Sequence, residues 1–481
     1  MKGHEGEPYS SSFAPLLRQK VALVWSTHQV AVAIILILWY ALGLALGSGP
    51  FTPVTPVQLG VLAADLLVVR RMSVWQLLGL RLGLLLRRAS GRSASTVSPL
   101  TADSTVGLLD VPGLDGSITP YRIVNSHFAG AAFVWDARHG EATALLRVSA
   151  LSTQLVSSDV KTMRAQGFSA ALHALDDRPD VTRVTIQARS LRRPIDPSPH
   201  GVDGQDLGSR DLIALEAGEL RESMRHDYIL GVTVNPERSP DGRRRALGLR
   251  EVGDVLCERV TQWCGTLLAA GVDGGDLLWL NAQQLRGEMK SMTDQDAYAL
   301  LDAQGRLADD VPVATSWREY DDHMSVGPGV ARTLWVDRWP DRDVPAAWLG
   351  ALDARLDLQL VFTLVLRMRG EREAKRALER QLNEADTIAR FNTRLGRQSD
   401  RRNTNESRLL AGQLHENAVN GGDIQFQGFA TVISPDIEHL DGDCRRLMAS
   451  TAGLLHFDRM RDQQLRRWIG ALPLGLEGRD A

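Results

Sequence analysis

The chain has 481 residues and a formal net charge of −3, from 55 basic and 58 acidic residues. This length exceeds one ordinary hydrophobic core and predicts two or three domains. The near balance of charge excludes a strong overall attraction to nucleic acid or anionic lipid. Cys257 and Cys264 lie seven residues apart with no nearby His or Cys to complete a metal site. We interpret these cysteines as small buried apolar residues.

The most apolar stretch lies near the amino terminus, after a loose polar tail at residues 1–20. Between Val21 and Ala64 there is no Asp, Glu, Lys or Arg. A helix over the first half of this stretch is long enough for a bilayer core of about 30 Å. Gly and Pro then interrupt the pattern, and a second apolar run follows. Residues 21–70 are therefore predicted to form a two-helix transmembrane hairpin.

Basic residues flank both ends of this predicted hairpin, with Arg18 and Lys20 before it and Arg70 and Arg71 after it. The connecting turn carries no positive charge. The positive-inside bias predicts a protein that crosses the cytoplasmic (inner) membrane of a bacterium twice, with both termini in the cytosol.

Residues 71–105 combine a leucine- and arginine-rich segment with a Ser/Thr-rich stretch. The first part is predicted to be a juxtamembrane helix on the inner leaflet. The alternative is a helix packed against the cytosolic body. The second part is typical of a linker.

The remaining chain alternates strand and helix patterns, which favours α+β layers. Two ferredoxin-like domains are expected, at 106–325 and 326–481, with a long helical insertion. The expected strands are at about 129–136, 141–150, 181–189, 228–235, 329–339, 358–366, 422–434 and 454–460. The expected helices are at about 158–175, 208–226, 249–270, 345–356, 371–418 and 435–451, with irregular helical structure at 275–328 and a short basic helix before the terminal ALPLG.

Catalytic motifs are missing from this pattern. None of the five lysines follows Gly, so a phosphate-cradling Walker A loop is excluded. The G-x-S-x-G, H-E-x-x-H and C-x-x-C motifs do not occur either. The sequence predicts no catalytic residue, cofactor or metal, and the scattered histidines are interpreted as structural or surface residues.

Arginines supply the candidate binding residues. Arg390, Arg394, Arg397 and Arg401 share one face if this region is helical, and could contact an acidic partner or phosphates. Ordinary solvation, with pairing to nearby acids, is the alternative. The terminal basic segment adds a second tentative docking group, namely Arg461, Arg466 and Arg467.

Three segments carry a family resemblance: ALERQLNEADTIARFNTRLGRQSDRR, GGDIQFQGFATVISPDIEHLDGDCRRLMAS and GLLHFDRMRDQQLRRWIGALPLG. Their order resembles the non-catalytic amino-terminal part of the CagE/TrbE/VirB-type traffic ATPases of conjugative type IV secretion. The layout is similar to an actinobacterial arrangement in which membrane subunit and ATPase are separate chains. Because a Walker A motif is missing, no ATPase activity is carried over.

The resemblance implies a non-catalytic, membrane-anchored scaffold for protein transport or conjugation. It would dock a separate P-loop traffic ATPase and other channel subunits, within an oligomeric complex on the lipid bilayer, and would meet nucleic acid only indirectly. A structural membrane component of type VII secretion is the first alternative. A membrane-bound hydrolase is the second, and it predicts a pocket that gathers at least three polar side chains.

Overall fold

The computed structural model describes residues 10–11, 34–41, 68–69 and 72–96 with a few neighbours, and most of 109–192, 224–369 and 423–476. The chain divides into two compact units, which we describe separately. The sheet unit comprises Met1–Phe13, Gly91–Arg372 and Asn420–Ala481, and the α3 unit comprises Ala14–Ser90 and Glu373–Val419.

The sheet unit contains one antiparallel sheet of 13 strands in the order β4-β11-β12-β13-β16-β15-β8-β9-β7-β6-β5, with β10 added to β7 and β17 to β13. The strands are β4 (Ala94–Thr96), β5 (Ile118–Arg122), β6 (Ala132–Asp136), β7 (Glu141–Ser149), β8 (Val181–Arg192), β9 (Met224–Val234), β10 (Leu277–Trp279), β11 (Ser316–Glu319), β12 (Met324–Val326), β13 (Gly329–Arg338), β15 (Gln359–Arg369), β16 (Asp423–Ser434) and β17 (His456–Arg459). A separate two-residue pair joins β1 (Ser10–Ser11) to β14 (Val344–Pro345).

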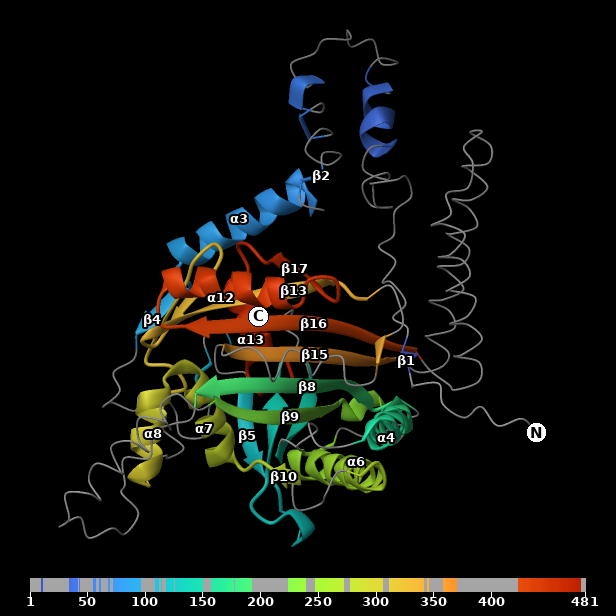
Figure 1. Cartoon of the computed structure of the whole chain (residues 1–481). Helices are drawn as coiled ribbons and strands as arrows, with labels where there is room; N and C mark the ends of the chain where they lie inside the picture. Colours follow the sequence, from blue (N-terminus) through green and yellow to red (C-terminus); the bar gives the residue numbers. More distant parts are fainter. Residues whose placement is uncertain are drawn as a thin grey trace, which may run out of the picture. The chain divides into compact units, whose positions relative to one another are not determined.

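Six helices accompany the sheet in the described residues of this unit: α4 (Ser158–Asp176), α6 (Leu249–Ala269), α7 (Ala282–Thr293), α8 (Gln295–Ala303), α12 (Ile437–Ser450) and α13 (Gln464–Ala471). Short 3-10 turns occupy Ser126–Phe128 and Pro236–Arg238. Figure 1 shows α4 and α6 lying side by side near β8 and β9. The α3 unit contains β2 (Val68–Val69), β3 (Met72–Ser73) and α3 (Val74–Ala89).

Strand pairing repeats within the sheet. β7, β9 and β8 are neighbours in that order, and β13, β16 and β15 repeat it on the other side. In the first half, β9 is followed by α6 and then by the short strand β10, which pairs with β7. In the second half, β16 is followed by α12 and then by the short strand β17, which pairs with β13. Buried threonine pairs occupy matching positions, with Oγ1–Oγ1 distances of 2.9 Å for Thr143–Thr233 and for Thr333–Thr431. The two halves meet where β8 pairs with β15.

The alternation of side chains along the strands gives the sheet two different faces. One face is apolar and carries α4 and α6 over the first half and α12 over the second. The other face contacts α7, α13 and the segment around Leu109, Val111 and Leu114. We call this second face the α13 face. It carries the polar residues of the central strands, such as Gln187 and Thr363.

The predicted fold class requires correction, because strands of both halves belong to one sheet. Two separate ferredoxin-like domains are therefore wrong. The two halves are joined because β8 pairs with β15 in antiparallel fashion over eight residues. The sequence of a central strand does not indicate which other strand will pair with each of its edges. The helix predicted at 208–226 is contradicted at its end, where β9 begins at Met224. The long helix at 371–418 and the helix at 345–356 lie outside the described residues, apart from Pro345 in β14.

The predicted transmembrane hairpin also requires correction. Over the described parts of the chain, no helix combines the length and apolar character needed to cross a bilayer. The described helical stretch at 34–41 corresponds to about 12 Å, well short of a bilayer core of about 30 Å. The rest of the apolar stretch lies largely outside the described residues. The hairpin, the membrane assignment and the two-pass placement in the cytoplasmic membrane are therefore not retained.

A side chain completes one edge of β13. This strand pairs with β12 through residues 329–331 and with β17 from Leu334 onward. Between them, the backbone N–H of Thr333 donates to Oε1 of Gln464 at 2.9 Å, and Nε2 of Gln464 donates to the Thr333 carbonyl at 3.3 Å. The buried Gln464 amide thus takes the place of a strand partner.

Replacing this amide should destabilise the protein. We expect Gln464→Leu to lower the free energy of unfolding by about 2 kcal/mol, because it leaves a buried N–H and a carbonyl unsatisfied. Urea unfolding followed by circular dichroism would measure the loss. Gln262→Leu, on the exposed side of α6, is the matched control and should change stability by less than about 0.5 kcal/mol. Equal effects of the two substitutions would contradict this role for Gln464.

Candidate functional site

The predicted docking arginines of the terminal segment have different environments. Arg466 is exposed on α13, and Arg461 lies before the helix with its side chain 45% exposed, 4.0 Å from Asp321. Arg467 is half-buried, and its guanidinium lies 5.4 Å from the centre of the Phe429 ring. Arg461 and Arg466 therefore remain available to a partner, whereas Arg467 packs on the sheet. Arg390, Arg394, Arg397 and Arg401 lie outside the described residues.

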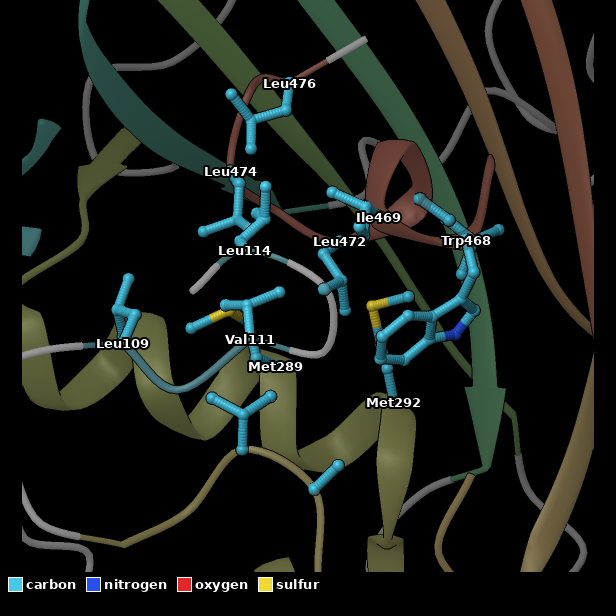
Figure 2. Packing of buried hydrophobic residues seen from close by; sticks show 14 of the residues in the cluster. Leu109, Val111, Leu114, Met289, Met292, Trp468, Ile469, Leu472, Leu474 and Leu476 are labelled. Carbon is cyan, nitrogen blue, oxygen red and sulfur yellow. The ribbon is translucent and has the colours of Figure 1, made fainter. Parts of the chain in front are cut away.

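The inward side of α13 packs into the core. Trp468 and Ile469 are buried, together with Leu472 and Leu474 after the helix. Figure 2 shows Trp468 beside Met292 of α7, and Leu474 beside Leu114. The apolar positions of this short segment thus join α13, α7 and the sheet in one cluster.

Polar contacts fix the end of α13 and the chain after it, which together we call the terminal strap (Gly470 to Leu476). Nε2 of Gln187 donates to the carbonyls of Ala471 and Leu472, at 2.9 and 3.1 Å. Nε of Arg183 donates to the Gly475 carbonyl at 2.6 Å. Gly475 has a φ of +69°, and a Cβ there would lie 2.5 Å from Cγ2 of Thr143. The ALPLG sequence is thus built into the α13 face.

A buried ionic cluster lies between α7 and the sheet. It consists of Arg147, Arg189, Arg225, Asp227 and Glu288. Arg189 Nη2 donates to Asp227 at 2.7 Å and to Glu288 at 2.6 Å, and its side chain is fully buried. Glu288 also accepts from Arg147 at 2.9 Å and from Arg225 at 2.8 Å. One carboxylate on α7 therefore joins guanidiniums from β7, β8 and β9.

Charge in this cluster determines its protonation. Burial by itself raises the pKa of Glu288, but the guanidiniums of Arg189 and Arg225 outweigh burial and lower that pKa to about 2. Burial by itself lowers the pKa of Arg189, but the nearby carboxylates of Glu288 and Asp227 outweigh burial and raise that pKa. Opposite charges therefore keep Glu288 and Arg189 ionised in a buried site, which is typical of a structural cluster.

The lowered pKa makes stability depend on acidity. Because the Glu288 carboxyl binds a proton more weakly in the folded state, its contribution is present above pH 4.5 and is lost as pH falls toward 2. We expect the free energy of unfolding to fall by about 3 kcal/mol from this group over that interval. Urea unfolding series at several pH values, for wild type and Glu288→Gln, would isolate this loss. The same pH slope in both proteins would contradict the assignment.

Other ionisable groups pair locally. His139, His323 and His439 lie 2.7–2.8 Å from Asp136, Asp322 and Asp436, respectively. Within the described residues, no three His, Cys, Asp or Glu side chains gather as a metal site.

Two further acidic side chains are buried and paired. Asp227 belongs to the ionic cluster, and Glu319 accepts from the Leu465 backbone N–H at 3.2 Å, next to the start of α13. Cys257 and Cys444 are buried, as interpreted, and Cys264 is half-buried. Burial, followed by the charge of Asp254, raises the pKa of Cys257 to about 11, which keeps that thiol protonated.

Sequence reasoning missed the ionic cluster. In β8, Val184, Ile186 and Ala188 alternate along one face, and Arg189 falls on the opposite, polar side. A polar alternate face normally indicates solvent. Here α7 and the terminal strap cover it, and only the pairing of distant segments brings Glu288 to Arg189.

Comparison with known proteins adds no assignment. No protein-family model matches the chain, and no curated protein matches it significantly.

Proposed function

We propose that this chain is a non-catalytic scaffold subunit of a bacterial secretion apparatus, and that it binds a separate P-loop ATPase. The observation that carries this proposal is an exposed basic pair, Arg461 and Arg466, beside the firmly packed helix α13. The ionic cluster holds α7 on the sheet and has a structural role.

Type IV secretion is the first candidate system, supported by the order of strands and helices around ALPLG. Type VII secretion is the second. In both systems the proposed role is to connect a nucleotide-driven motor with other subunits.

The proposed ATPase-binding surface is the basic edge formed by Arg466 on α13 and Arg461 just before it. Both side chains are exposed, while Trp468 and the terminal strap fix the helix from beneath. A firmly packed helix with an exposed basic edge suits an acidic protein surface, because little ordering is required on binding.

Site-specific crosslinking tests this proposal. A photo-crosslinking amino acid at position 461 or 466 of the full chain, expressed in its native host, should attach a P-loop ATPase that mass spectrometry identifies. Position 163 on α4, whose Met is 60% exposed, is the control and should not attach it. The double variant Arg461→Glu/Arg466→Glu should lose the co-purified ATPase. A crosslinked set without an ATPase would overturn the proposal, and the identity of the attached subunits separates type IV from type VII.

A further inference from the structure

Helix α3 carries an exposed apolar ridge. Leu78, Leu82, Leu85 and Leu86 are 54%, 58%, 51% and 61% exposed. These positions span roughly 100° of the helix circumference, at 3.6 residues per turn. Four large side chains on one narrow strip differ from the isolated exposed leucines that are normal on a surface, and such a strip marks a binding surface.

The spacing of the ridge is that of a helix-pairing seam. Leu78, Leu82 and Leu85 are separated by four and three residues, the alternation that places side chains at a and d of a heptad. Arg81 and Arg88 are seven residues apart and occupy the same flanking heptad position. Since α3 contains no acidic residue, the charges that the helix itself carries beside the seam are all positive.

Two glycines lie beside the same ridge. Gly79 and Gly83 sit inside α3, where each costs about 1 kcal/mol of helix stability relative to alanine. A Cβ at Gly79 would meet nothing within 4 Å, and one at Gly83 would meet only Nη1 of Arg87, at 3.6 Å. Packing within the described chain therefore gives no reason for them. A flat strip beside an apolar ridge allows another helix to approach closely.

We propose that the α3 ridge binds an amphipathic helix of another polypeptide, with leucine-like residues in its seam and acidic residues beside it. This proposal rests on the scaffold function and names a second partner surface. Charge favours an acidic partner over a second copy of α3, whose flanking charges are all basic. The glycines favour a helix over a lipid surface, because lipid chains adapt to a helix without needing a flat strip.

Peptide binding to the full chain tests the proposal. The probes are two labelled synthetic peptides of three heptads with Leu at a and d, one carrying Glu and the other Lys at e and g. Fluorescence anisotropy should show the acidic peptide binding at least about tenfold more tightly, and Arg81→Glu/Arg88→Glu should reverse this order. Leu82→Glu should abolish binding. Met163→Glu, which changes an exposed apolar residue on α4, is the control and should leave binding unchanged.

A glycine variant separates the possible occupants. Gly79→Ala/Gly83→Ala should strengthen α3 as a helix, seen by circular dichroism, yet weaken the acidic peptide about tenfold. Equal affinity for both peptides would overturn the proposal. Binding to phosphatidylglycerol vesicles that the glycine variant leaves intact would assign the ridge to lipid, and self-association lost in Leu82→Glu would assign it to a second copy. Peptide binding without an ATPase crosslink at α13 would refute the scaffold assignment alone.

Discussion

Glu288→Ala should lower the free energy of unfolding by about 3–5 kcal/mol, the usual effect of removing one partner from a buried ion pair. Glu288 accepts hydrogen bonds from three guanidiniums, and Arg189 among them has no exposed surface. Without Glu288, the cluster keeps three positive charges against the single carboxylate of Asp227. The substitution therefore leaves charge buried without enough compensation, in addition to removing contacts between α7 and the sheet.

Guanidinium chloride unfolding followed by fluorescence and circular dichroism would measure this loss. Glu258→Ala is the matched control, because Glu258 pairs with Arg259 on α6 while its own side chain is 60% exposed. It should change stability by less than about 1 kcal/mol. Glu288→Gln should fall between wild type and Glu288→Ala, since the amide oxygen still accepts a hydrogen bond. A loss for Glu288→Ala no larger than that of Glu258→Ala would contradict the structural role of the cluster.

Trp468→Ala should cost about 3–5 kcal/mol, the range for truncating a large buried aromatic side chain. Trp468 is fully buried and packs with Met292 of α7 beneath α13 (Figure 2). Its loss removes the largest apolar contact of α13, and the terminal strap depends on α13 for its position over Gln187. The cavity should therefore loosen both segments.

Hydrogen exchange would show where the structure loosens. Peptides covering residues 464–476 should exchange faster in Trp468→Ala, whereas peptides from α4, on the other face of the sheet, should change little. Arg466→Ala, two residues away and exposed, is the control and should stay within about 0.5 kcal/mol of wild type. Uniform acceleration across the chain would contradict a local role for Trp468.

Local patterns predicted individual elements better than their assembly. The expected strand at 181–189 lies within β8, and the helix expected at 249–270 closely matches α6. Period-2 and period-3.6 repeats of apolar residues carry this information within a few neighbours. The edge-to-edge pairing of β8 with β15 joins residues more than 170 positions apart, and no short pattern encodes it.

The candidate site was harder to predict for the same reason. Arg466 was predicted from the basic character of the terminal segment, and it is exposed on α13, while its docking role stays a prediction. Arg189 and Glu288 were missed because charged residues are rarely buried, and their mutual compensation exists only after α7 has packed on the sheet. The apolar run from Val21 was overvalued, since its composition does not by itself establish one uninterrupted helix.

The shared sheet has a mechanical consequence. Antiparallel hydrogen bonds at the β8–β15 junction run across eight consecutive residue pairs, so a load applied along these strands is carried by many bonds at once. The two halves should therefore move as one plate when either end of the sheet is displaced. A displacement started at α13 would then reach the far edge strand β5 without loss at a hinge.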